Sequence, residues 1–396
     1  MEIKKIFTAD FFRAVQNRPL YLFGAGKVAQ IAYNLCKESD VAVKGFCVSD
    51  VQNNKAVYNG LPVISARELA SKEKNAVIVI AVLERGEKRI ANFLRNLGFC
   101  EIITLPEDIL TYDPWNAERY RSPIIEVTSK IGCAVNCRFC PQSNLLKAYF
   151  KGNKNRKSEM TFEEYKNFLE KLPKETIVDF SGFVEPFFNK DSLKMMEYTV
   201  ESGHSATLFT TFEGLSLEEF VRLVKIPFRY LCIHTADADG FANIPITEEY
   251  LAILAKAIEA KKPDGSPFID NANCQSTPHP EVLKLTEGKL KVYCEMSDRA
   301  GNLDKNAGNL THVHKHGKIR CSRAAAMNHF VLLPDGSLAL CCNDFGLKHI
   351  VGNLNESSYE QIVRGEEMKR VWLAMTTDGD DDFICRKCYY AVEKRA

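Results

Sequence analysis

Short apolar runs alternate with amphipathic segments over the first third of the chain. The apolar runs span residues 19–26, 41–50, 75–82 and 101–106. Between them, apolar residues recur at helical spacing, notably in 27–38, 66–72 and 84–97. Strands that alternate with helices in this way predict a parallel sheet with right-handed crossover connections.

The same alternation begins again near Tyr120. Strands are predicted at 123–133, 176–182, 205–211 and 228–235, and helices at 161–171, 190–202, 216–225 and 247–262. A repeated strand–helix order predicts a barrel or partial barrel, whose ligands lie at the carboxyl ends of the strands. We therefore expect an α/β protein with three parts, covering residues 1–112, 120–305 and 306–396.

Composition narrows the choice of function. The net charge of this 396-residue chain is +1, so no overall field favours nucleic acid or an acidic membrane surface. No stretch approaches the ~20 apolar residues of a membrane span, and the first residues lack a signal-peptide pattern. Fourteen cysteines without such a signal predict a cytoplasmic protein, whose thiols are metal ligands or buried apolar groups.

A glycine motif marks the first strand-to-helix junction. Gly24 and Gly26 begin a GxGxxA pattern, and Asp50 closes the second strand, where a dinucleotide fold places a ribose-binding acid. The alternative is that the glycines only permit tight packing of strand and helix. The segment resembles the small nucleotide-sugar-binding Rossmann-like domains of sugar-modifying enzymes. That resemblance implies a nucleotide or nucleotide sugar as ligand.

Three cysteines follow the first strand of the middle part. Cys133, Cys137 and Cys140 have the spacing CxxxCxxC. Three thiolates leave a four-iron cluster one ligand short, and an open metal position is typical of catalytic rather than structural sites. A structural zinc knuckle and three unrelated buried thiols are the alternatives.

This loop, with Phe139 before its third cysteine, resembles the cluster-binding loop of the radical S-adenosylmethionine (SAM) superfamily. The resemblance implies a partial (β/α)6 barrel and a 4Fe–4S cluster whose open iron binds the amino and carboxylate groups of SAM. It also implies a 5′-deoxyadenosyl radical as the reagent, and an external electron donor such as a flavodoxin or ferredoxin.

Two further strand ends match the resemblance. Ser181, Gly182 and Glu185 lie where the family has a GGE-type segment that holds the SAM amino group, although only one glycine is present here. Thr210 and Thr211 lie where polar side chains contact the ribose in relatives. The alternatives are that Glu185 only anchors its loop and that the threonines have no ligand.

A second group of cysteines lies near the end of the sequence. The spacing C-x14-G-x4-C joins Cys321 to Cys341, and Cys385 and Cys388 follow as CxxC. Four thiolates from three loops complete a metal site. The spacing resembles the SPASM extension, here in the abbreviated twitch form that implies one auxiliary 4Fe–4S cluster, with Cys342 as an additional cysteine. A zinc ribbon is the alternative.

Residues near these cysteines are candidates for catalysis. Asp344 could act as a base or accept a substrate hydrogen bond, and Arg299 could orient a hydroxyl or anionic group. Surface salt bridges are the alternative for both residues. The tract of His312, His314 and His316 could bind metal, although such polar tracts are usually solvated.

These parts predict an oxidoreductase. A deoxyadenosyl radical would abstract hydrogen from the substrate, and an auxiliary cluster would accept an electron, which together oxidise a carbohydrate or a nucleotide-linked sugar. A maturase of ribosomally made peptides and a redox-sensing protein without substrate chemistry are the alternatives. Neither nucleic acid nor membrane is an expected partner.

Overall fold

The computed structural model forms two compact units, Met1–Glu118 and Arg119–Ala396. The structure describes residues 4–5, 11, 14–15, 18–38, 41–51, 54, 56–82, 87–105, 122–152, 157–294, 298–303, 314–324, 327–377 and 382–393.

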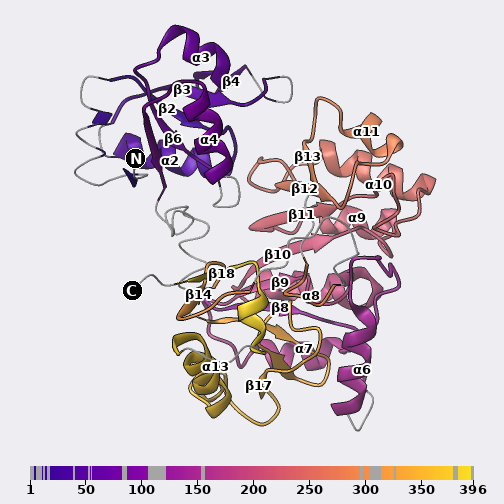
Figure 1. Ribbon diagram of the computed structural model, residues 1–396. Helices are drawn as coiled ribbons and strands as arrows, with labels where there is room; N and C mark the ends of the chain where they lie inside the picture. Colours follow the sequence, from indigo (N-terminus) through magenta and orange to yellow (C-terminus); the bar gives the residue numbers. More distant parts are fainter. Residues whose placement is uncertain are drawn as a thin grey trace. The chain divides into compact units, whose positions relative to one another are not determined.

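The first unit contains a seven-stranded sheet in the order β1-β7-β6-β2-β3-β5-β4 (Figure 1). All neighbours are parallel except the β4–β5 pair. The strands are β1 (Lys4–Lys5), β2 (Leu20–Phe23), β3 (Val43–Val48), β4 (Val57–Tyr58), β5 (Leu61–Ser65), β6 (Val77–Ile80) and β7 (Glu101–Thr104). The predicted parallel sheet is confirmed, with β4 and β5 added at one edge.

Helices cover both faces of this sheet. Leu20 and Leu22 of β2 pack with α2 (Lys27–Glu38) on one face. Tyr21 and Phe23 pack on the opposite face with α3 (Ala66–Lys72) and α4 (Glu87–Asn96). Successive strand residues point to opposite faces, so a continuous apolar run such as β2 supplies both cores.

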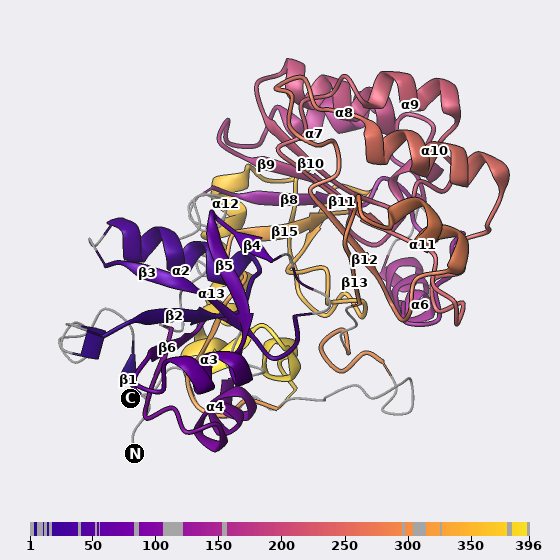
Figure 2. The same ribbon diagram turned by 90° about the horizontal axis from the view of Figure 1, so that it is seen from above.

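The second unit contains a nine-stranded sheet, in which β8 to β13 lie side by side in chain order (Figure 2). These six strands are all parallel. They are β8 (Ile124–Val127), β9 (Ile177–Phe180), β10 (Ser205–Thr210), β11 (Tyr230–His234), β12 (Asn271–Cys274) and β13 (Val292–Cys294). This is the predicted partial (β/α)6 barrel, and the α/β fold class is confirmed.

Helices connect the barrel strands. They are α6 (Gln142–Gly152), α7 (Phe162–Leu169), α8 (Ser192–Glu201), α9 (Leu217–Leu223), α10 (Glu248–Glu259) and α11 (Pro280–Thr286), with the 3₁₀ turn η3 (Pro186–Phe188) before α8. Capping boxes start α7 and α9, where Thr161 pairs with Glu164 and Ser216 with Glu219. Both motifs satisfy amide groups that the first turn of a helix leaves without partners.

The C-terminal part continues the barrel sheet. Strand β15 (His329–Leu332) pairs in parallel with β8, and β16 (Ser337–Ala339) and β17 (Ile350–Asn353) follow as antiparallel neighbours. Strand β14 (Ile319–Cys321) pairs with β18 (Ala391–Glu393) in a separate ribbon. The remaining elements are α12 (Tyr359–Val363), α13 (Glu366–Thr376) and η4 (Ile384–Lys387). The boundary at residue 306 stays a prediction.

Candidate active site

The three-cysteine loop begins a few residues after β8. Gly132 and Asn136 have positive φ angles of 94° and 49°, which let the loop turn sharply. The amide of Cys140 donates to the carbonyl of Cys137 at 3.0 Å. Burial, together with Cys140 and Cys133 nearby, raises the pKa of the Cys137 thiol to about 12. The structure thus brings the three predicted thiols together.

Neighbouring groups donate hydrogen bonds to these sulfurs. The amide of Glu185 lies 3.4 Å from Cys133 Sγ, and Gln142 Nε2 lies 3.5 Å from Cys140 Sγ. Donors of this kind stabilise thiolate ligands, and a bound metal would deprotonate the thiols despite their burial. Three thiols in one loop therefore fit a cluster that keeps one iron open for a ligand other than protein.

Glu185 connects two of the predicted cofactor segments. Its Oε1 accepts a hydrogen bond from Thr210 Oγ1 at 2.7 Å. Its Oε2 accepts from the Thr211 amide at 2.6 Å and from Thr211 Oγ1 at 2.8 Å. Burial raises the pKa of Glu185 to about 7, against these hydrogen bonds, which lower it. The carboxylate therefore anchors its loop between the cysteine loop and the end of β10, and its contact with SAM stays a prediction.

Close packing explains why glycine is required at position 182. Its φ is 65°, and a Cβ atom there would lie 2.3 Å from Thr128 Oγ1. That hydroxyl accepts the amide hydrogen of Phe183 at 3.0 Å. The single glycine therefore lets the loop after β9 approach β8 closely. Ser181 precedes it and is partly exposed at the strand end.

The four predicted auxiliary cysteines line one cavity. Its lining contains Cys321, Cys341, Cys385 and Cys388, together with Arg323, Met327, His329 and Tyr390. Backbone amides donate to three of the sulfurs, from Ala324 to Cys321 at 3.3 Å, from Asn343 to Cys341 at 3.5 Å and from Tyr390 to Cys388 at 3.4 Å. This donor set fits a metal cluster with four protein ligands.

Cys342 does not line this cavity. Its Sγ accepts a hydrogen bond from Arg323 Nη1 at 3.3 Å. The pKa of the Cys342 thiol is raised, first by a hydrogen bond with Cys341, then by burial, and then by the negative charge of nearby Glu126. Cys342, the additional cysteine of the sequence pattern, thus lies beside the charged residues Arg323 and Glu126.

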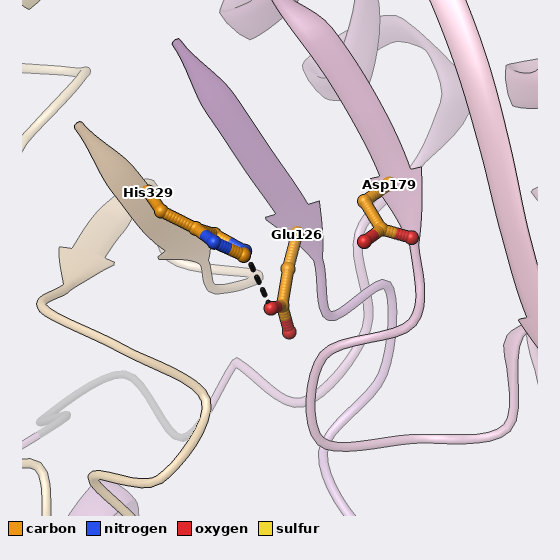
Figure 3. Close-up of side chains that lie close together, drawn as sticks. All are labelled: Glu126, Asp179 and His329. Carbon is orange, nitrogen blue, oxygen red and sulfur yellow. Dashed lines mark ion pairs between the residues drawn. The ribbon is translucent and has the colours of Figure 1, made fainter. Parts of the chain in front are cut away.

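Sequence reasoning missed this buried group. Glu126 on β8, Asp179 on β9 and His329 on β15 lie together with ligand atoms within 4.8 Å, and the His329 ring is directed at Glu126 (Figure 3). His329 Nε2 lies 2.6 Å and Arg323 Nη2 lies 3.3 Å from Glu126 Oε1. The signal was present, because a single acid interrupts each of the apolar runs IIEV and IVDF.

The electrostatics of this group favour an ion-pair network over a metal site. Burial by itself would raise the pKa of Glu126, but His329 and Arg323 hold it well below its usual range. A guanidinium so close to the carboxylate opposes a divalent cation there. His329 is notable because it also lines the four-cysteine cavity.

Arg299 lies beside the three-cysteine loop. Its guanidinium carbon is 5.9 Å from the centre of the Phe139 ring. Its charge lowers the pKa of Cys140, although burial raises that pKa overall. Arg299 thus lies next to the cluster loop, and its catalytic role stays a prediction.

Asp344 is fully buried and holds a turn. Its Oδ1 accepts from the Lys348 amide at 3.0 Å, and its Oδ2 accepts from the His349 amide at 2.8 Å. Both oxygens therefore have backbone donors, as in a turn-stabilising aspartate. Its role as a base stays a prediction.

The remaining candidates lie outside this region. His312 is not among the described residues. The rings of His314 and His316 lie 4.7 Å apart, and both residues are exposed. In the first unit, Gly24 and Gly26 lie between β2 and α2, and Asp50 is exposed after β3. None of the described helices is long and apolar enough to cross a membrane.

Comparisons with known proteins agree with this arrangement. Residues 321–389 match the SPASM family, described as an iron-sulfur cluster-binding domain. Comparison with curated protein sequences gave no significant match.

Three solved structures illustrate the low level of similarity. BtrN in complex with AdoMet and 2-DOIA is 16% identical, with a TM-score of 0.42 over 64% of this chain and 87% of that chain. AnSMEcpe with bound AdoMet is 12% identical, with a TM-score of 0.39 over 68% and 84%. Streptococcus suis SuiB bound to precursor peptide SuiA is 10% identical, with a TM-score of 0.41 over 75% and 74%.

The three-cysteine loop follows the first of six parallel strands, and four further cysteines from the SPASM-matching segment line one cavity. The chain thus carries a segment similar to SPASM iron–sulfur cluster-binding domains, and its barrel unit has the strand order and the three-cysteine loop expected of a radical SAM protein.

Proposed function

We propose that the chain is a radical SAM dehydrogenase that oxidises a hydroxyl group of a carbohydrate or nucleotide-linked sugar. The observation that carries this proposal is the position of His329. Its side chain lines the four-cysteine cavity and lies 2.6 Å from Glu126 on the first barrel strand. An oxidation must remove both an electron and a proton, and here an electron-accepting site adjoins ionisable groups of the barrel.

Cys133, Cys137 and Cys140 would hold the SAM cluster, and Cys321, Cys341, Cys385 and Cys388 the auxiliary cluster. When bound, these groups supply an electron that cleaves SAM to the 5′-deoxyadenosyl radical and a site that accepts an electron from the substrate. In sum, the substrate carbon loses a hydrogen atom, and its hydroxyl then loses a proton and an electron, which leaves a carbonyl.

The chain's own residues would hold the cofactor loop, orient the substrate and take up the proton. Glu185, with Thr210 and Thr211, fixes the loop beside Cys133, where SAM would bind in this proposal. Arg299 would orient the substrate through its planar fork of donors. Asp344 is the proton acceptor expected from the sequence. The Glu126–His329 pair adjoins the cysteine cavity and would fix the charges beside it.

The first unit supports a sugar-nucleotide rather than a peptide substrate. In its sheet, β2 lies between β3 and β6, so the direction of strand order reverses beside the Gly24–Gly26 turn. Ligands of such sheets bind at this reversal, beyond the carboxyl ends of the strands. We therefore place a nucleotide or nucleotide sugar at Gly24, Gly26 and Asp50 in this proposal.

The two glycines differ in a way that supports a ligand. Gly24 has φ 123°, and a Cβ atom there would lie 2.7 Å from the Ala81 carbonyl oxygen, so packing alone requires glycine. Among the described residues, a Cβ atom on Gly26 would meet nothing within 4 Å. A phosphate that approached the start of α2 closely would explain why position 26 is glycine, which internal packing does not explain.

Anaerobic reconstitution followed by a SAM-cleavage assay tests the proposal. We expect about eight irons per chain, because each 4Fe–4S cluster contributes four. With dithionite and SAM, sugars or nucleotide sugars should increase 5′-deoxyadenosine release and yield a carbonyl product. Turnover of peptides alone would instead indicate a maturase. Failure to form any 5′-deoxyadenosine would indicate a redox protein without substrate chemistry.

A further inference from the structure

The turn after β13 has a strained backbone. Arg299, Ala300 and Gly301 are three consecutive residues with positive φ angles, 51°, 55° and 76°. The left-handed region is strained for residues other than glycine, and it persists only where surrounding contacts enforce it. The contacts that hold this turn in place therefore show which parts of the protein it connects.

One side of the turn faces the three-cysteine loop. The Arg299 guanidinium lies over the Phe139 ring, and its charge lowers the pKa of Cys137 and of Cys140 against the effect of burial. Burial, and after it the same charge, lowers the pKa of His234 on β11 to about 4. Arg299 is thus within electrostatic reach of the loop that would hold the SAM cluster.

The other side of the turn is joined to the auxiliary cysteines through Asn302. Its Nδ2 donates to the Arg299 carbonyl at 2.7 Å and to the Asn343 carbonyl at 2.8 Å. Asn343 in turn donates from its amide to Cys341 Sγ at 3.5 Å and from its Nδ2 to Cys388 Sγ at 3.7 Å. A primary amide has two hydrogens, and Asn302 uses one for each partner.

We propose that Asn302 is a positioning residue that couples the two cysteine sites. Binding of a ligand beside the three-cysteine loop changes the environment of Arg299, and Asn302 passes a shift of that turn to Asn343. Hydrogen bonds to cluster sulfurs tune the reduction potential, so a shift of Asn343 changes the potential of the auxiliary cluster. The inference rests on the two clusters and not on the identity of the substrate.

The test uses the reconstituted full chain and S-adenosylhomocysteine, a SAM analogue without a sulfonium that cannot be cleaved. The midpoint potential of the auxiliary cluster is followed by EPR-monitored redox titration with and without this analogue. We expect the analogue to shift the wild-type potential. Coupling is reciprocal, so the affinity for the analogue should differ about fivefold or more between the oxidised and reduced auxiliary cluster.

Asn302→Leu keeps the approximate shape of the side chain and removes both donors. It should load both clusters and bind the analogue, yet lose the shift, with the two affinities within about twofold of each other. Asn302→Ala should behave in the same way. Asn355→Leu is the matched control, because Asn355 is exposed and its Nδ2 donates to the Asp335 carbonyl at 2.9 Å in a different turn. It should retain the full shift.

Two results would overturn the inference. The first is a wild-type auxiliary potential that does not respond to the analogue. The second is a full shift in Asn302→Leu or Asn302→Ala. Neither result bears on the proposed dehydrogenation, because no substrate takes part and no turnover is measured.

Discussion

Thr210 Oγ1 donates a hydrogen bond of 2.7 Å to Glu185 Oε1, which ties the end of β10 to the loop after β9. Two stretches that are 25 positions apart in the sequence thus meet beside Cys133. The contact explains why a buried carboxylate and a pair of threonines stand at neighbouring strand ends.

Replacement of Glu185 by glutamine should impair SAM cleavage. The amide group cannot accept at both ends, so donors at Thr210 or Thr211 lose a partner and the loop beside Cys133 moves. We expect a loss of about 10–100-fold in cleavage rate, the usual range for residues that orient ligands of a metal site. The assay is 5′-deoxyadenosine release, with Glu197→Gln as control, since Glu197 only pairs with Arg222 on the surface. Wild-type cleavage by Glu185→Gln would contradict the anchoring role.

Replacement of Cys341 by alanine separates the two cysteine sites. Iron content should fall from about eight to about four per chain, since a site with three remaining thiols holds its cluster poorly. SAM cleavage should persist, whereas Cys137→Ala should abolish it. Iron and sulfide counting and 5′-deoxyadenosine release check both expectations. An unchanged iron content in Cys341→Ala would exclude Cys341 as a ligand.

The two glycines of the first unit should respond differently to substitution. Gly24→Ala should destabilise the chain by about 1–3 kcal/mol, because alanine is strained at φ 123° and its Cβ would clash with Ala81. Gly26→Val should leave the unfolding midpoint nearly unchanged, because space is open there. If the turn binds a nucleotide, Gly26→Val should weaken that binding in calorimetry with UDP-sugars. Equal affinity in wild type and Gly26→Val would argue against the site.

Removal of Glu126 should be costly for stability. Glu126→Ala leaves Arg323 and His329 without the carboxylate that they share, and breaking a buried ion pair in this way costs about 3–5 kcal/mol. Glu126→Gln should cost less, since it keeps the volume and one acceptor. Urea unfolding of the reconstituted chain measures both. Similar stability of wild type and Glu126→Ala would show that the network contributes little.

His204 should make stability depend on pH. This residue precedes β10, is buried, and lies 3.3 Å through Nδ1 from the Thr176 carbonyl. Burial lowers its pKa in the folded state, so the unfolded chain takes up a proton first as the pH falls. The folded state should lose stability below the unfolded value of about 6.5. Thermal unfolding at pH 8, 7 and 6 checks this, and His204→Gln should show a weaker dependence than wild type.

Much of the fold was predictable from local pattern. The barrel strands β8 to β11 fall inside predicted apolar runs, because buried parallel strands are apolar on both faces. Strand β12 was missed, since its sequence NANC has low strand propensity, and it forms because β11 and β13 flank it. The runs also overstated strand length, as at 128–133, where the chain leaves the sheet to form the cysteine loop.

The sequence by itself determined which thiols share a loop, because spacing along the chain is a local property. Only the tertiary structure decided which distant residues share a site. The register of β8, β9 and β15 brings Glu126, Asp179 and His329 together, and no spacing along the chain predicts that contact. The same holds for Asn302, whose two hydrogen bonds join turns 41 residues apart. Parallel strands bring together residues that are far apart in sequence, so such contacts depend on the complete sheet.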